Sequence, residues 1–123
     1  MADHQRGRAA AFETAYPLTV GKEYSVVGMS ITENVFYFLV QEDWGGPCFA
    51  PAGMFELVSA PIPPGWHFAL RSGVRASGRD LWADPIVALW GYRELVEQGE
   101  HLTDLLEHEQ VALAVFRAYV VAT

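Results

Sequence analysis

Two apolar runs, at residues 24–31 and 35–40, are the clearest pattern in the chain. The first run alternates between two faces as a strand does, and Gly28 within it predicts a bend or a bulge. The polar residues 32–34 between the runs are typical of a short turn. We therefore predict an antiparallel hairpin whose first strand is strongly curved.

The second run, from Val35 to Val40, is apolar at every position. A strand with one face in water would alternate, so a continuous apolar run indicates that both of its faces are covered. The cover on the second face is expected to be either the C-terminal helices or a partner.

Further strands are predicted in the first 71 residues. Residues 42–47 form a polar turn with two glycines, and Pro51 confines the third strand to a sheet edge or ends it before residues 54–58. Residues 66–71 then alternate with the period of a half-buried strand. We expect a sheet over residues 17–71, a flexible N-terminal arm over residues 1–16 and a loop over residues 72–83.

Two helices are predicted over residues 84–121. Asp84 and Pro85 suit the N-cap and the first helical position, and Gly99 offers a stop. The second helix is expected from about Thr103, where apolar residues recur at helical spacing. We predict a single α+β domain over residues 17–123, in which a small, strongly bent antiparallel sheet or partly open barrel precedes two C-terminal α-helices.

Composition narrows the class of protein. The chain has 123 residues, of which 51% are hydrophobic, so one domain can bury a core without metal or disulfide staples. Cys48 is the single cysteine, which excludes an internal disulfide. The longest apolar run is far shorter than the roughly 20 residues of a membrane span. We expect a cytoplasmic protein without a membrane segment.

Acidic charge is concentrated in the last third of the chain. The net charge is −7, and −6 of it arises from residue 80 onward, where eight acids accompany Arg93 and Arg117. Such a surface repels nucleic acid phosphates and attracts basic proteins. Amphipathic helices with solvated acidic faces would give the same pattern. The charge therefore disfavours nucleic acid binding and is compatible with a basic protein partner.

Residues able to carry chemistry are few. His101, Asp104 and His108 have spacing that could suit a metal ion, but no fourth ligand accompanies them, and we predict neither a metal nor a cofactor. Cys48 lies in an apolar segment, which favours an inert thiol over a nucleophile.

Tryptophans at the ends of elements are the remaining signal. Trp44 lies in a turn, Trp66 follows a proline-rich corner and Trp82 precedes the first predicted helix. Aromatic side chains in such places often anchor interfaces, although they also pack beneath loops. Trp44 is expected to be the most exposed of the three, because Asp43 and two glycines surround it.

Several segments together resemble a known family. They are Pro17 to Gly28, the aromatic second strand, the Ala50-Pro51-Ala52 corner before residues 55–58, the Pro63-Pro64-Gly65-Trp66 corner and, more loosely, residues 115–119. In these segments the chain resembles small bacterial immunity proteins, which neutralise toxins exchanged between neighbouring cells and whose sheet is similar to a Src-homology-three barrel. The resemblance implies a cytosolic protein that binds a cognate toxin domain.

The sequence and the resemblance together predict a non-catalytic inhibitor that occludes a basic, nuclease-like toxin through an acidic surface. The expected partner-binding residues are Asp43, Trp44, Trp82, Glu94, Glu97, Glu100, Asp104 and Glu107. Two alternatives stay open. One is a peptide-binding module with an aromatic groove formed by Tyr24, Tyr37, Trp44 and Trp66. The other is a small enzyme that uses His67 or Cys48.

Overall fold

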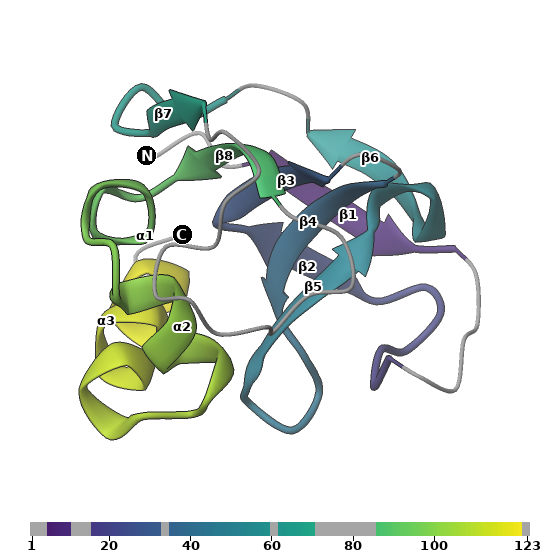
Figure 1. Cartoon of the computed structure of the whole chain (residues 1–123). Helices are drawn as coiled ribbons and strands as arrows, with labels where there is room; N and C mark the ends of the chain where they lie inside the picture. The colour runs from purple at the N-terminus through teal and green to yellow at the C-terminus, as the bar shows by residue number, and fades with distance from the viewer. Residues whose placement is uncertain (1–4, 11–15, 33–34, 60–61, 71–85, 122–123) are drawn as a thin grey trace.

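The fold is α+β, with two antiparallel sheets followed by C-terminal helices (Figure 1). The computed structural model describes residues 5–10, 16–32, 35–59, 62–70 and 86–121. In chain order its elements are β1 (Gln5–Ala9), β2 (Glu23–Val26), β3 (Gly28–Thr32), β4 (Phe36–Gln41), β5 (Pro47–Pro51), the 3-10 turn η1 (Ala52–Met54), β6 (Phe55–Ser59), β7 (His67–Leu70), β8 (Ile86–Gly91), α1 (Arg93–Glu97), α2 (His101–Leu106) and α3 (Gln110–Val121). The predicted α+β class is confirmed.

The described strands form a five-stranded and a three-stranded sheet. The larger has the order β5-β4-β3-β8-β7 and the smaller the order β2-β1-β6. All of the pairs are antiparallel. Neither sheet closes into a barrel among these strands, because the two edge strands of each sheet do not pair with one another.

The predicted curved first strand is divided between the two sheets. β2 ends at Val26 and β3 begins at Gly28, so the chain crosses from the smaller sheet to the larger one within a few residues. The N–H of Val27, at the crossing, donates to the Leu39 carbonyl at 3.0 Å. The bend expected near Gly28 is confirmed, and it joins two sheets instead of curving one.

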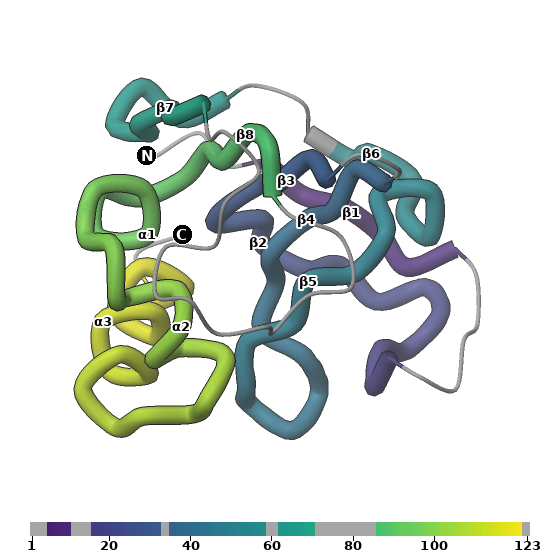
Figure 2. The backbone as a smooth tube through the Cα atoms, viewed as in Figure 1, coloured from purple at the N-terminus to yellow at the C-terminus, as the bar shows by residue number. Residues whose placement is uncertain are grey.

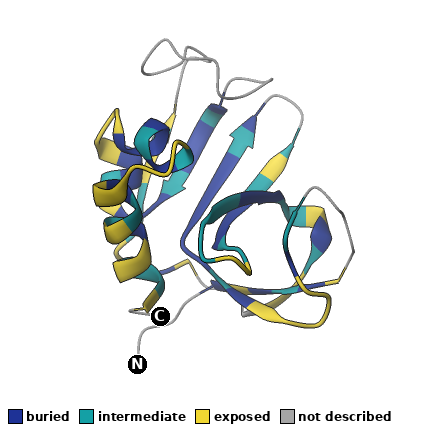
Figure 3. Cartoon of the chain, turned by 90° about the horizontal axis from the view of Figure 1, so that it is seen from below, coloured by how far each residue is buried: buried dark blue, intermediate teal, exposed yellow. Residues whose placement is uncertain are grey.

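The larger sheet lies between two apolar layers. Leu39 on one face belongs to a core cluster with the three helices, which includes Leu89, Leu95, Leu105 and Phe116. A second cluster fills the space between the two sheets and contains Ala9, Tyr24, Val26, Met29, Phe38, Val40 and Ala50. Both faces of β4 are therefore covered, as its continuous apolar run predicted. Figure 3 shows the buried central strands, with the exposed residues of the helices turned outward.

The N-terminal segment differs from the prediction of a flexible arm over residues 1–16. Residues 5–9 form β1, which lies between β2 and β6 in the smaller sheet. Gln5, Gly7 and Ala9 face inward and are buried. Because these residues are small or polar, the strand has almost no hydrophobic pattern of its own. The large apolar side chains of this layer come from the neighbouring strands. The strand therefore depends on contacts that are distant in sequence.

The helix predicted from Asp84 is wrong over residues 86–91. This segment is the strand β8, which pairs with β3 on one side and β7 on the other. Asp84 and Pro85, which supplied the helix signal, lie outside the described residues. A short apolar run bounded by turn signals suits a buried central strand as well as a helix, and here the two neighbouring strands decide between them.

Two glycines allow the close packing of β8 against β3 and α1. Gly28 and Gly91 lie opposite each other in the sheet, and the backbone of Gly91 has φ of +149°. A Cβ atom at Gly91 would lie 2.7 Å from Leu95 Cδ2 and 2.9 Å from the carbonyl oxygen of Val27. Only glycine fits there without displacement of the first helix.

The C-terminal region contains three helices where two were predicted (Figure 2). α2 ends in a Schellman turn, in which the N–H groups of His108 and Glu109 donate to the carbonyls of Leu105 and Asp104 at 3.1 and 2.9 Å. His108 takes the left-handed position with φ of +59°. The Glu109 carboxylate then caps α3 by accepting the N–H groups of Val111 and Ala112. This turn divides the single helix expected from Thr103 onward.

Candidate functional site

The hairpin between β4 and β5 is a tight, internally bonded turn over residues 42–46. The N–H of Glu42 donates to the Gly46 carbonyl at 2.9 Å, and the N–H of Gly46 donates to Glu42 Oε1 at 2.6 Å. Gly45 adopts φ of +91°, a conformation that side chains disfavour. The two glycines and the polar residues before them thus favour this turn locally, as the sequence predicted.

Trp44 is presented on this hairpin and is 85% exposed. Other large apolar side chains are also exposed, but no other tryptophan among the described residues is exposed to a similar extent. An indole left in water forgoes a large hydrophobic gain, and tryptophan is enriched among residues that dominate binding energy at interfaces. The predicted exposure of Trp44 is confirmed.

Asp43 fixes one side of the hairpin. Its carboxylate accepts hydrogen bonds from Thr19 Oγ1 and the Tyr24 hydroxyl, each at 2.6 Å, and from Lys22 Nζ at 3.0 Å. Its N–H donates to the Pro17 carbonyl at 3.0 Å. The hydrogen bond from Thr19, followed by that from Tyr24, lowers the pKa of Asp43 to about 2. The carboxylate is therefore ionised and held in place at neutral pH.

Tyr24 connects this charged group to the core between the sheets. Its ring is buried, and its hydroxyl accepts the Thr19 N–H at 2.8 Å while it donates to Asp43. Burial, with the hydrogen bond to Asp43, raises the pKa of Tyr24, so the hydroxyl keeps its proton. The Lys22 ammonium lies 5.1 Å from the centre of the ring. Loop 17–22, strand β2 and the hairpin are thereby joined as one unit.

Arg117 of α3 fixes the other side of the hairpin. Its Nε and Nη2 atoms donate to the Gly45 carbonyl at 3.2 and 3.1 Å, and Gln41 Nε2 donates to the same oxygen at 3.0 Å. Trp44 thus lies between two anchored residues, Asp43 and Gly45. The sequence did not single out Arg117, because its partner is a backbone carbonyl 72 residues away.

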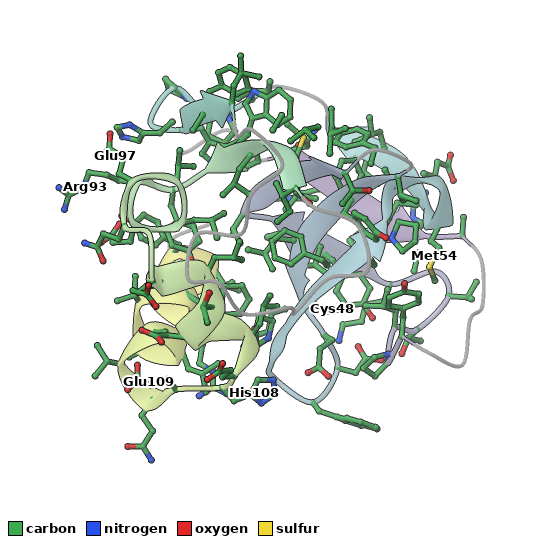
Figure 4. All side chains as sticks on the ribbon, in the orientation of Figure 1. Cys48, Met54, Arg93, Glu97, His108 and Glu109 are labelled. Atoms are coloured by element: carbon green, nitrogen blue, oxygen red, sulfur yellow. The ribbon has the colours of Figure 1, made fainter. Side chains whose placement is uncertain are left out.

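His108 lies beside the same hairpin. A Cβ atom placed on Gly46 would be 3.5 Å from His108 Cε1. Figure 4 shows His108 at the end of the helical layer nearest to the hairpin. A non-glycine residue in the left-handed region is strained, and such strain is found preferentially at functional sites.

The acidic residues predicted in the helices are distributed along the helical layer and do not all lie beside Trp44. Glu94 is half-buried and accepts the Tyr119 hydroxyl at 2.8 Å, and Glu97 contacts His67 Nδ1 at 3.1 Å. In Figure 4, Glu97 lies at the end of the helical layer opposite His108. Asp104 is half-buried in α2. Glu100 and Glu107 are exposed at the two ends of this helix. Trp82 lies outside the described residues.

A buried polar pair replaces the metal-like arrangement of His101, Asp104 and His108. The Tyr92 hydroxyl and His101 Nε2 are 2.7 Å apart inside the helical layer, and the Tyr92 ring stacks on Tyr119 with centroids 4.4 Å apart. Burial raises the pKa of Tyr92 and lowers the pKa of His101, so both groups are neutral and share one hydrogen bond. No three His, Cys, Asp or Glu side chains gather around a metal position in the described part of the chain.

The other candidate groups are separated from one another. Burial, with a smaller contribution from Glu42, raises the pKa of the Cys48 thiol to about 11, which makes the thiolate scarce. His67 lies on the edge strand β7, where its side chain contacts Glu97 of α1.

The rings proposed for a peptide groove do not share a surface. Tyr24 is buried between the sheets, Trp66 packs against that same cluster, and Tyr37 packs against the opposite, helical cluster. The predicted groove of Tyr24, Tyr37, Trp44 and Trp66 is therefore wrong.

Among the described helices, none combines the length and apolar character needed to cross a membrane. Comparisons with models of known families, with curated proteins and with solved structures found no match to this chain.

Proposed function

We propose that this protein is a non-catalytic inhibitor that binds a protein partner through the hairpin over residues 42–46, with Trp44 as the central contact. The observation that carries the proposal is the 85% exposure of an indole on a turn fixed from two sides. Binding loses less conformational entropy when the anchor is already held in place. The exposed and preorganised Trp44 is therefore better explained as part of a specific interface than as part of a turn without a binding role.

The partner that fits this hairpin is a basic protein. Two acids, Glu42 and Asp43, precede Trp44, and Glu107 and Glu109 flank His108 beside the hairpin. The remaining helical acids extend the negative potential around the molecule and speed the approach of a basic partner. Occlusion of a toxin active site requires no chemistry from the inhibitor, only a surface complementary to the toxin.

The immunity-type role is the specific form of this proposal. It rests on the resemblance of residues 17–66 to that family, and the bent, antiparallel sheets that meet near Gly28 are compatible with it. In this role the protein stays in the cytoplasm and neutralises a toxin domain delivered by neighbouring cells.

The test is co-expression with the products of the adjacent genes, each first checked for toxicity on its own. Wild-type protein is expected to restore growth and to form a stable complex, and Trp44→Ala is expected to lose both while remaining folded. Val111→Ala is the matched control, because Val111 is 69% exposed on α3, on a different element from the hairpin. Equal rescue by the two variants would remove Trp44 from the interface, and no rescue by the wild type would contradict the inhibitor role.

A further inference from the structure

A hollow of about 330 Å³ opens beside Trp44, between β2, the hairpin and the end of α3. Its lining includes Lys22 and Glu23 at the start of β2, Glu42, Asp43 and Gly45 of the hairpin, and Val120 of α3. Residues on both sides of Trp44 in the chain therefore line it. The volume is at the lower end of the range for ligand sites, so it suits one side chain of a partner better than a cofactor.

The lining of the hollow is negative overall. It contains three carboxylates, those of Glu23, Glu42 and Asp43, and one ammonium group, that of Lys22, which gives a net charge of −2. Lys22 donates to Asp43 at 3.0 Å, so the one cation is already paired with the most strongly bonded of the acids. Arg117 approaches Gly45 but does not belong to the lining. A second cation would therefore meet the field of Glu42 and that of Glu23, whose charge Arg8 partly offsets.

The two remaining carboxylates are positioned by the fold. Glu42 Oε1 accepts the Gly46 N–H at 2.6 Å, and Glu23 Oε2 lies 3.5 Å from Arg8 Nη2. An ionised carboxylate can accept about four hydrogen bonds, so these contacts do not saturate Glu42. Val120 adds an apolar surface against which the methylene groups of a long side chain can pack.

We propose that this hollow receives an arginine side chain of the protein partner while Trp44 packs against an apolar residue next to that arginine. The inference rests on the proposed function and adds the chemistry of the partner. Arginine fits better than lysine because its planar fork donates several hydrogen bonds to carboxylates while its stem remains apolar. The partner segment is thus expected to pair one arginine with one large apolar side chain.

The test uses the free protein and two small probes of similar shape, one with a charged guanidinium group and one with a neutral urea group. N-acetyl-arginine amide is expected to give saturable NMR shifts of the backbone amides of Glu23, Ser25 and Gly45, and N-acetyl-citrulline amide, its neutral analogue, is expected to give none. Glu42→Gln keeps an acceptor for the Gly46 N–H and should weaken arginine binding about three- to fivefold, the range of an exposed ion pair. High salt should weaken it as well.

Glu56→Gln is the control variant. Glu56 approaches the same arginine as Glu23, with Oε2 3.7 Å from Arg8 Nη1, but it lies on β6 and does not line the hollow. Its removal can act on the hollow only through Arg8, so it should weaken arginine binding less than Glu42→Gln does. Equal shifts with both probes, or shifts confined to other surfaces, would overturn the assignment of the hollow.

The outcome is separable from that of the co-expression test. If Trp44→Ala abolishes rescue but arginine amide does not bind, the hollow is wrongly assigned and the proposed function stands. If arginine amide binds as expected but Trp44→Ala still rescues growth, the hollow stands as a guanidinium site and the role of Trp44 falls.

Discussion

Two regions of this molecule each combine a tyrosine hydroxyl contact with a glycine of positive φ, but one region is buried and the other is exposed. At the junction of β8 with the helices, a tyrosine hydroxyl bonds to a buried imidazole, and Gly91 has positive φ. At the hairpin, a tyrosine hydroxyl bonds to an exposed, ionised carboxylate, and Gly45 has positive φ. The first arrangement is neutral and closes the core, whereas the second is charged and holds Trp44 in solvent. In both regions a tyrosine and a glycine have the same roles. The difference lies in the group that the tyrosine hydroxyl contacts: a buried, neutral group completes the core, whereas a charged group near the surface holds an exposed turn.

The largest difference between the regions is expected for alanine at the two glycines. Gly91→Ala should lower the free energy of unfolding by about 3 to 5 kcal/mol, because the methyl group meets backbone atoms and the φ angle is strained. Gly45→Ala should cost only about 1 to 2 kcal/mol, because strain alone acts there. The nearest atom to a Cβ at Gly45 is 3.8 Å away. Urea denaturation of both variants checks this, and equal losses would contradict the close packing of β8.

Removal of the two tyrosine hydroxyls is expected to give the next largest effect. Tyr92→Phe leaves the buried Nε2 of His101 without its hydrogen-bond partner and should cost about 2 kcal/mol. Tyr24→Phe should cost less than about 1 kcal/mol, because water can replace the lost bond at the partly exposed Asp43. The same denaturation curves measure both, and Tyr24→Phe should also weaken partner binding. A larger loss for Tyr24→Phe would reverse the comparison.

The two regions should respond to acid at different pH values. Burial lowers the pKa of His101 below its usual 6.5, so the unfolded chain binds the proton more readily and stability decreases as the pH falls below about 6.5. Asp43 has its pKa lowered from 3.8 to about 2, so its contribution is present above about pH 4 and is lost as the pH falls toward 2.

Variants assign these two acid transitions. Unfolding free energies measured from pH 8 to pH 5 should lose most of their decline in His101→Gln, and those below pH 4 should become flatter in Asp43→Asn. A decline between pH 8 and pH 5 that is unchanged in His101→Gln would show that another group controls it.

The smallest effect is expected at the turn that adjoins the hairpin. His108→Gly removes the strain of a left-handed side chain and should raise the free energy of unfolding by about 0.5 to 1 kcal/mol, after the entropy of glycine is subtracted. His108→Ala keeps the strain and serves as the control, with no expected gain. If His108→Gly also weakens the partner complex, the strained residue belongs to the interface; a loss of stability in this variant would contradict the strain.

The parts of the structure that are set by local residues were predicted from the sequence. The turn over residues 42–46, the edge position of the strand that ends at Pro51 and the exposure of Trp44 all follow from glycine, proline and polar residues within a few positions of one another. The coverage of both faces of β4 also followed from its own apolar run.

The incorrect predictions concern segments whose structure depends on distant neighbours. β1 has no large apolar residue of its own, and residues 86–91 suit a helix or a strand until β3 and β7 are placed beside them. The same limit applies to the site. The contacts of the Asp43 carboxylate with Thr19, Lys22 and Tyr24, which hold the hairpin, span 19 to 24 residues and could not be predicted from the residues near Asp43.

The position of β8 has a consequence for synthesis on the ribosome. The strands β3, β4 and β5 can pair as soon as residue 51 has left the exit tunnel, but β8, which joins them to β7, follows more than thirty residues later in the chain. Until then β3 and β7 lack β8, the strand with which both of them pair. Strand edges that are exposed in this way favour misassembly. A nascent chain of this protein is thus expected to need protection by chaperones until about residue 91 emerges, and the helices that follow then cover the completed sheet.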